Sequence, residues 1–100
     1  MKQKYKKHSI EKKTEIPTNL REAIKNLDSL ISEADKRFLV EHGALAVHHS
    51  LGRWIRNNWG LWEDHSELKF NMVKLGFIHS DDISNFIIEE YIKHLKETLK

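Results

Sequence analysis

The densest concentration of chemically capable side chains lies in the segment RWIRNNWGLW, residues Arg53–Trp62. It places three tryptophans within nine residues and interleaves them with two arginines and two asparagines. Guanidinium groups bind carboxylates and phosphates through paired hydrogen bonds, and indole rings offer flat surfaces for stacking. The segment therefore predicts either a recognition surface or an unusually aromatic part of the core.

Helical spacing divides this segment and the residues before it into two faces. A step of about 100° per residue places one set on an apolar side, namely Val47, Leu51, Trp54, Ile55 and Asn58. The same step places a second set on the opposite side, namely His49, Arg53, Arg56 and Asn57. We expect His49, Arg53 and Arg56 to form a compact basic recognition surface. The alternative is that the arginines form salt bridges with the domain's own carboxylates, Asp81 or Asp82.

The three tryptophans are expected to differ in their surroundings. Trp54 lies on the apolar face and belongs in the core. Trp59 and Trp62 flank Gly60 beyond the helix, so they either close the core or line a surface groove, and core packing is the favoured role. Asn58 is an amide on the apolar face, where a missing partner costs about 1–3 kcal/mol. We therefore expect Asn58 to bind the backbone of the Gly60 turn.

Length, composition and charge predict one small domain behind a basic leader. The 100 residues are 39% hydrophobic and 32% charged, and the lack of cysteine excludes disulfides, thiolate zinc sites and cysteine nucleophiles. Residues 1–16 hold six lysines against two glutamates, a net charge of +4, and since the whole chain carries +2, residues 17–100 carry −2. We expect residues 1–16 to be a disordered leader and residues 17–100 to be the folded domain.

No segment approaches the roughly 20 apolar residues of a membrane span, and the leader lacks the apolar run of a secretory signal. These two absences predict a cytoplasmic protein without a membrane partner.

Apolar residues recur at helical spacing from Pro17 onward, behind residues that can cap helices. We predict an all-α fold, a compact single domain of four or five helices, over residues 20–31, 33–42, 44–58, 66–75 and 80–99. Thr18 or Asn19 is expected to begin the first helix, Ser32 and Ser66 are expected to begin the second and the fourth, and Ser80 is expected to begin the last one. Gly52 in the third helix costs about 1 kcal/mol relative to alanine, which predicts a close approach by a neighbouring helix.

Metal and catalytic motifs are not found in this sequence. There are seven histidines, but His48 and His49 are adjacent and point about 100° apart on a helix, and no HExxH motif accompanies them. Neither a phosphate-binding loop, nor a nucleophile elbow, nor a catalytic pair of carboxylates can be placed. We therefore predict no metal, no cofactor and no enzymatic activity.

Three segments resemble a small bacterial and phage domain family of unknown function: residues 16–24 (IPTNLREAI), 54–62 (WIRNNWGLW) and 76–88 (GFIHSDDISNFII). The resemblance spans residues 17–95, with Phe77 and Ser80 standing where the family pattern has Ile and Pro. It implies a bacterial or phage setting and a Trp-Arg-Asn centre near a His-Asp-Asp turn. The family-pattern positions are Trp54, Arg56, Asn57, Asn58, Trp59, His79, Asp81, Asp82 and Ser84.

Two functions from different classes remain open. The first is non-catalytic binding of a protein partner, as by an immunity-like or counter-defence inhibitor. The second is binding of a nucleotide or another small phosphorylated ligand between Arg56, Asn57 and the tryptophans. Nucleic acid is expected to bind only through the basic leader, if it binds at all. For these functions the candidate binding residues are Arg53, Arg56, Asn57, Trp59, Trp62, His79, Asp81 and Asp82.

Overall fold

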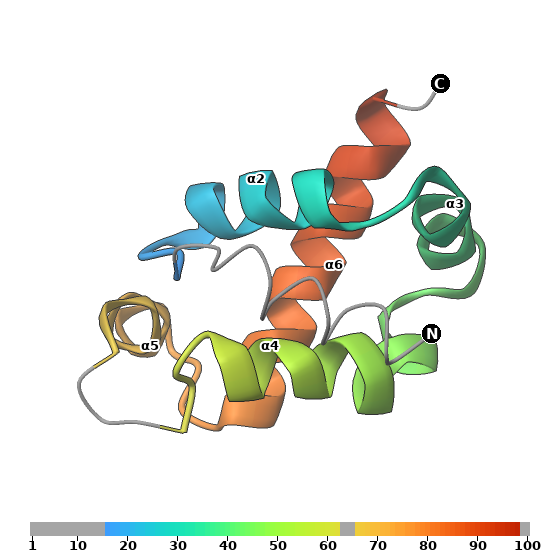
Figure 1. Cartoon of the computed structure of the whole chain (residues 1–100). Helices are drawn as coiled ribbons and strands as arrows, with labels where there is room; N and C mark the ends of the chain where they lie inside the picture. Colours follow the sequence, from blue (N-terminus) through green and yellow to red (C-terminus); the bar gives the residue numbers. More distant parts are fainter. Residues whose placement is uncertain (1–15, 63–65, 99–100) are drawn as a thin grey trace.

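The structure is a computed structural model that describes residues 16–62 and 66–98. Of the expected basic leader, residues 1–15 lie outside the described residues. The all-α prediction is confirmed, because the described residues form helices and contain no strand (Figure 1). The elements are α2 (Leu20–Leu30), α3 (Glu33–His42), η1 (Ala44–Val47), η2 (His48–Gly52), α4 (Arg53–Asn58), α5 (Glu67–Lys74) and α6 (Ser80–Thr98).

Side-chain caps begin three of the helices, as the sequence predicts. The side-chain oxygens of Asn19, Ser32 and Ser66 accept hydrogen bonds from backbone N–H groups at the starts of α2, α3 and α5. At α2 the Glu22 carboxylate also accepts bonds from the Thr18 N–H (2.9 Å) and hydroxyl (3.0 Å). These bonds, led by that from the backbone N–H, lower the pKa of Glu22.

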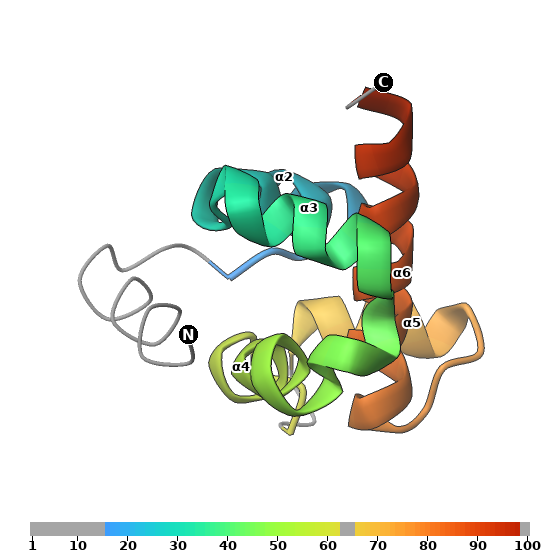
Figure 2. The same ribbon diagram turned by 90° about the vertical axis from the view of Figure 1, so that its right-hand side faces the viewer.

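The 19-residue helix α6 forms the spine of the domain. It contacts each of the other α-helices, with α2 and α3 along its C-terminal half and α4 and α5 beside its N-terminal half (Figures 1 and 2). Phe86 is only partly buried and stacks on Phe77, with ring centroids 4.3 Å apart. The buried face of α6 consists of Ser80, Ile83, Ser84, Ile87, Ile88, Tyr91, Ile92 and Leu95.

The segment 44–58, predicted to be one regular helix, is composed of three different helical pieces. η1 is a 3₁₀-helix, η2 is a π-helix and only α4 is an α-helix. A π-helix closes its hydrogen bonds over one more residue than an α-helix, so it advances fewer degrees per residue. A wheel drawn for a regular helix therefore misplaces the side chains that follow η2.

Candidate functional site

Arg56 is buried, although the helical wheel placed it on an exposed basic surface. Its side chain leaves α4, is 6% exposed and reaches α6. There Nη1 donates a hydrogen bond to the Ser84 hydroxyl (2.9 Å), and Nε lies 3.3 Å from Asp81 Oδ1 as an ion pair. Nη2 donates to the His48 carbonyl oxygen (3.4 Å). The structure thus contains the predicted alternative, an internal salt bridge to Asp81.

Gly52 provides the space for this guanidinium. It precedes Arg56 by one helical turn, and long helical side chains point back toward the N-terminus of their helix. A Cβ atom on Gly52 would lie 3.0 Å from Arg56 Nη1 and 3.7 Å from Ser84 Oγ. The close approach predicted at Gly52 is present, but it is made by Arg56, whereas the neighbouring helix α6 lies at ordinary van der Waals distance through Ser84. We refer to Gly52, Arg56, Asp81 and Ser84 as the Arg56 cluster.

The compact basic surface expected from His49, Arg53 and Arg56 does not form. His49 and Arg53 are exposed, whereas Arg56 turns inward and is paired. A guanidinium is tolerated inside a protein only where charge and hydrogen-bond partners accompany it. The Ser84 hydroxyl and the Asp81 carboxylate supply those partners at the first two turns of α6, so the prediction of a basic surface was wrong.

The three tryptophans lie in two environments. Trp54 and Trp59 are 7% and 2% exposed and meet edge to face with ring centroids 5.7 Å apart, which confirms their core role. Trp62 is 60% exposed, and its Nε1 donates to Asn57 Oδ1 (2.8 Å). Asn58 Nδ2 donates to the Trp54 carbonyl oxygen within the helix (2.8 Å). The favoured prediction of core packing is therefore wrong for Trp62, and the alternative, a place at the surface, is the one observed.

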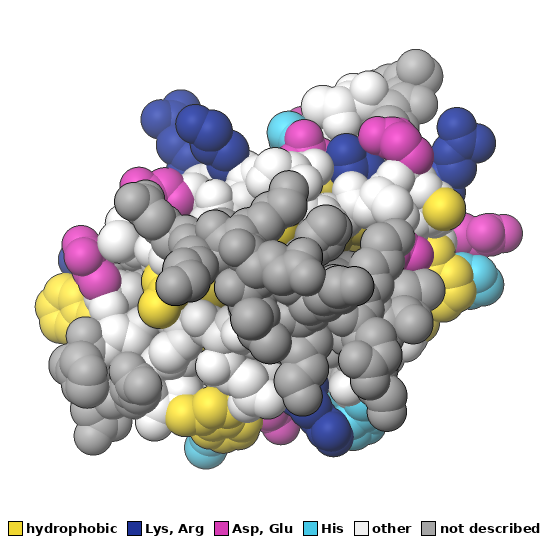
Figure 3. Space-filling view, viewed as in Figure 1, with side chains coloured by type: hydrophobic (Ala, Val, Ile, Leu, Met, Phe, Trp, Pro, Cys, Tyr) yellow, Lys and Arg dark blue, Asp and Glu magenta, His cyan; other side chains and the backbone are white. Residues whose placement is uncertain are grey.

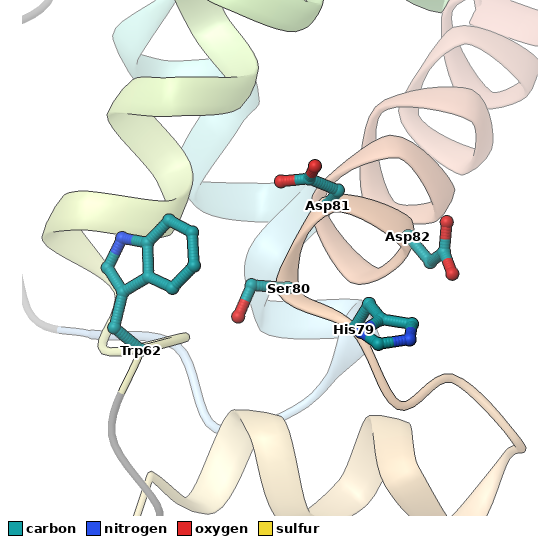
Figure 4. Close-up of a pocket in the computed structure, with 5 residues that line it drawn as sticks. All are labelled: Trp62, His79, Ser80, Asp81 and Asp82. Atoms are coloured by element: carbon teal, nitrogen blue, oxygen red, sulfur yellow. The ribbon is translucent and has the colours of Figure 1, made fainter.

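An open depression of about 410 Å³ lies between the end of α4 and the start of α6. Figure 4 shows Asp81 pointing toward α4, whereas Asp82 and His79 point to the side away from Trp62. In Figure 3, hydrophobic side chains project from the lower edge of the molecule below α4, next to acidic, basic and histidine side chains. We call this site the Trp62 depression; its lining residues are Trp62, His79, Ser80, Asp81 and Asp82.

A hydrogen bond between the two elements fixes the base of the Trp62 depression. The buried Ser80 hydroxyl at the start of α6 donates to the Leu61 carbonyl oxygen (2.5 Å) in the turn that carries Trp62. The Asp82 carboxylate forms no ion pair with any described residue. The depression therefore presents a fixed indole ring on one side and, on the other, an imidazole and a carboxylate that point away from the indole, and these groups suit polar or cationic side chains rather than anions.

The structure brings most of the predicted binding residues together but gives them different surroundings. Arg56 and Trp59 lie in the interior, and Arg53 is exposed without lining the depression. The remaining ones line the depression or bond to a lining residue, namely Asn57, Trp62, His79, Asp81 and Asp82. No role was predicted for Ser84; the available signal was a serine within the apolar stripe of α6, where a buried hydroxyl needs a polar partner.

Two further features bear on function. Among the described residues, no group of three or more His, Asp or Glu side chains is arranged to hold a metal ion. Nor does any helix in the described ranges combine the length and hydropathy that crossing a membrane requires.

The fold and the site together define a small all-helical domain built on one long helix, with a buried arginine cluster beneath an exposed tryptophan. The chain belongs to the family described as a domain of unknown function (DUF6794), whose model matches residues 16–95. This match agrees with the resemblance to an uncharacterised family. No curated protein and no solved structure matches the chain.

Proposed function

We propose that the domain is a non-catalytic protein-interaction module that receives its partner at the Trp62 depression. The single observation that carries this proposal is the state of Trp62, a large apolar side chain that stays 60% exposed while its N–H is bonded to Asn57. Tryptophan is enriched at the centres of interfaces, where it contributes a large share of the binding energy. An indole ring already fixed in place loses little conformational freedom when a partner covers it.

The setting of this interaction is part of the same proposal. The family resemblance and the small size favour a bacterial or phage protein, acting in the cytoplasm as an immunity-like or counter-defence inhibitor. An inhibitor of this kind needs a docking surface and no catalytic group. The Trp62 depression supplies such a surface on a domain of about 80 residues.

A phosphorylated ligand held by Arg56, Asn57 and the tryptophans is less well supported at this site. Arg56 and Trp59 are buried, and the Asn57 side-chain oxygen already accepts the Trp62 N–H. The carboxylates of Asp81 and Asp82 at the rim would repel a phosphate. The Trp62 depression therefore suits a protein partner better than a phosphorylated ligand.

Affinity capture from a bacterial host lysate tests the proposal. Two variants are compared, each of which removes one exposed aromatic side chain. Trp62→Ala removes the exposed indole, and Phe70→Ala removes an aromatic ring of similar exposure (61%) on α5, outside the depression. We expect a partner that is retained by the wild type and by Phe70→Ala but lost with Trp62→Ala. Capture that is unchanged in Trp62→Ala, or lost equally in both variants, would contradict the proposal.

A further inference from the structure

A second cavity lies on the other half of the molecule, between α2 and the C-terminal half of α6. It measures about 390 Å³, a size that accommodates a small ligand. We call it the α2–α6 cleft; its lining residues are Arg21, Ile24, Lys25, Asp28 and His94. The residues from α2 follow helical spacing along one ridge, and His94 faces them from α6.

Arg21 is not explained by the stability of α2, whereas Lys25 lies close enough to Glu22 to attract its carboxylate. Arg21 and Lys25 are four residues apart on one helix, so their like charges repel. Arg21 also lies in the first turn of α2, where the helix dipole favours acidic side chains. Neither Arg21 nor Lys25 forms a hydrogen bond or an ion pair with any described residue. Their donors are therefore available to a ligand.

The one carboxylate of the cleft is already occupied. Asp28 Oδ1 accepts a hydrogen bond from the Tyr91 hydroxyl (3.1 Å) and lies 3.3 Å from Lys36 Nζ. Lys36 is shared between Asp28 and Glu33, and the lining itself holds two cations against the one carboxylate of Asp28, so the net charge that the cleft presents is positive. The positive charge of the cleft is opposite in sign to the net charge of residues 17–100, which is −2. Figure 3 shows Lys and Arg side chains gathered above the left end of α2.

We propose that the α2–α6 cleft binds the phosphate group of a small phosphate monoester. Arg21 and Lys25 donate to the phosphate oxygens, since charge-assisted hydrogen bonds of this kind are the strongest that proteins make. The apolar side chain of Ile24 lines the cleft with the two cations, and the His94 ring stacks on Tyr91 with centroids 6.2 Å apart. These side chains provide a surface for the organic part of the ligand. This site is separate from the Trp62 depression and does not depend on the function proposed there.

Titration of the full chain with phenyl phosphate, followed by calorimetry and by amide chemical shifts, tests this assignment. We expect saturable binding with the largest shifts at residues 21–28 and 91–94. Arg21→Gln combined with Lys25→Gln should weaken binding by at least about ten-fold, equivalent to roughly 1.4 kcal/mol. The matched control, Arg37→Gln with Lys74→Gln, removes two exposed cations from α3 and α5 and should bind like the wild type.

Three results would overturn the assignment. The first is the absence of saturable binding to phenyl phosphate. The second is equal weakening in the cleft variant and in the control, which would indicate general charge attraction only. The third is binding of benzoate as tight as that of phenyl phosphate, which would show that the cleft does not select a phosphate over a carboxylate.

Discussion

Arg56 and Trp62 belong to one ten-residue segment, and residue type alone made both candidates for contact with a ligand. The structure places them in opposite environments. Arg56 is directed inward, where Nη1 bonds to Ser84 and the buried Nε forms an ion pair with Asp81 without a hydrogen bond, whereas Trp62 is directed outward and its indole N–H donates to Asn57. A polar side chain that looks reactive is buried, and an aromatic side chain that looks like core is exposed. Partners, rather than residue type, decide which of the two remains free to bind.

This comparison assigns different consequences to mutations in the two regions. Changes in the Arg56 cluster and its tryptophan neighbours should reduce the stability of the fold. Changes at the rim of the Trp62 depression should leave stability nearly unchanged and affect binding.

The largest effect on stability is expected from Trp59→Ala. Trp59 is 2% exposed and packs against Trp54, so its truncation leaves a large cavity. We expect the free energy of unfolding to fall by about 3–5 kcal/mol. Chemical denaturation followed by circular dichroism measures this loss. A loss below about 1 kcal/mol is typical of a surface site and would contradict the core position of Trp59.

Substitutions of Asp81 and of Arg56, which form an ion pair, should lower the free energy of unfolding by different amounts. Asp81→Asn leaves a buried guanidinium without its carboxylate, so we expect a loss of about 2 kcal/mol, less than for a fully buried pair because Asp81 is 60% exposed. Arg56→Met leaves only the water-accessible Asp81 unpaired and replaces the buried stem with an apolar one, so about 1 kcal/mol is expected. The midpoints of denaturant unfolding show which of the two variants loses more stability. A larger loss for Arg56→Met would mean that the guanidinium stabilises the fold more than its burial costs.

The effect of Gly52→Ala on the free energy of unfolding should change sign when residue 56 is changed. In the wild type the new methyl group meets Arg56 Nη1 at 3.0 Å, so we expect a loss of about 1 kcal/mol despite the better helix propensity of alanine. In the Arg56→Met background the same change should stabilise the domain by about 0.5–1 kcal/mol. A double-mutant cycle measures this coupling. Equal effects in both backgrounds would show that Gly52 does not serve the guanidinium.

Much of the fold follows from the sequence, because capping residues and apolar spacing act locally. Ser32 and Ser66 begin the helices at which they were expected, Asn19 is the one of the two candidates that caps α2, and α6 buries apolar residues at helical spacing. The regular helix over 44–58 could not be excluded by local preference, since the π-helical η2 depends on packing against α6. The meeting of the Trp-Arg-Asn segment with the His-Asp-Asp turn was implied by the family resemblance and is observed in the Arg56–Asp81 ion pair.

The candidate site was harder to predict, because side-chain direction there depends on contacts distant in sequence. Arg56 turns inward only because Ser84 lies 28 residues later on α6, and no local pattern encodes that partner. Trp62 is exposed, and its N–H donates to Asn57 rather than to a core group. Composition indicated the importance of the segment, but not which of its residues face outward.

The smallest expected change in stability belongs to Trp62→Ala, and it provides the most direct test. Because Trp62 is 60% exposed, we expect the free energy of unfolding to change by less than about 0.5 kcal/mol. The decisive measurement is the dissociation constant of the captured partner for this variant and for the wild type, in preparations of equal stability. A weakening by at least about 30-fold, equivalent to roughly 2 kcal/mol at an interface hot spot, is the predicted result. An unchanged dissociation constant would contradict the claim that the outward half of the segment is the docking surface.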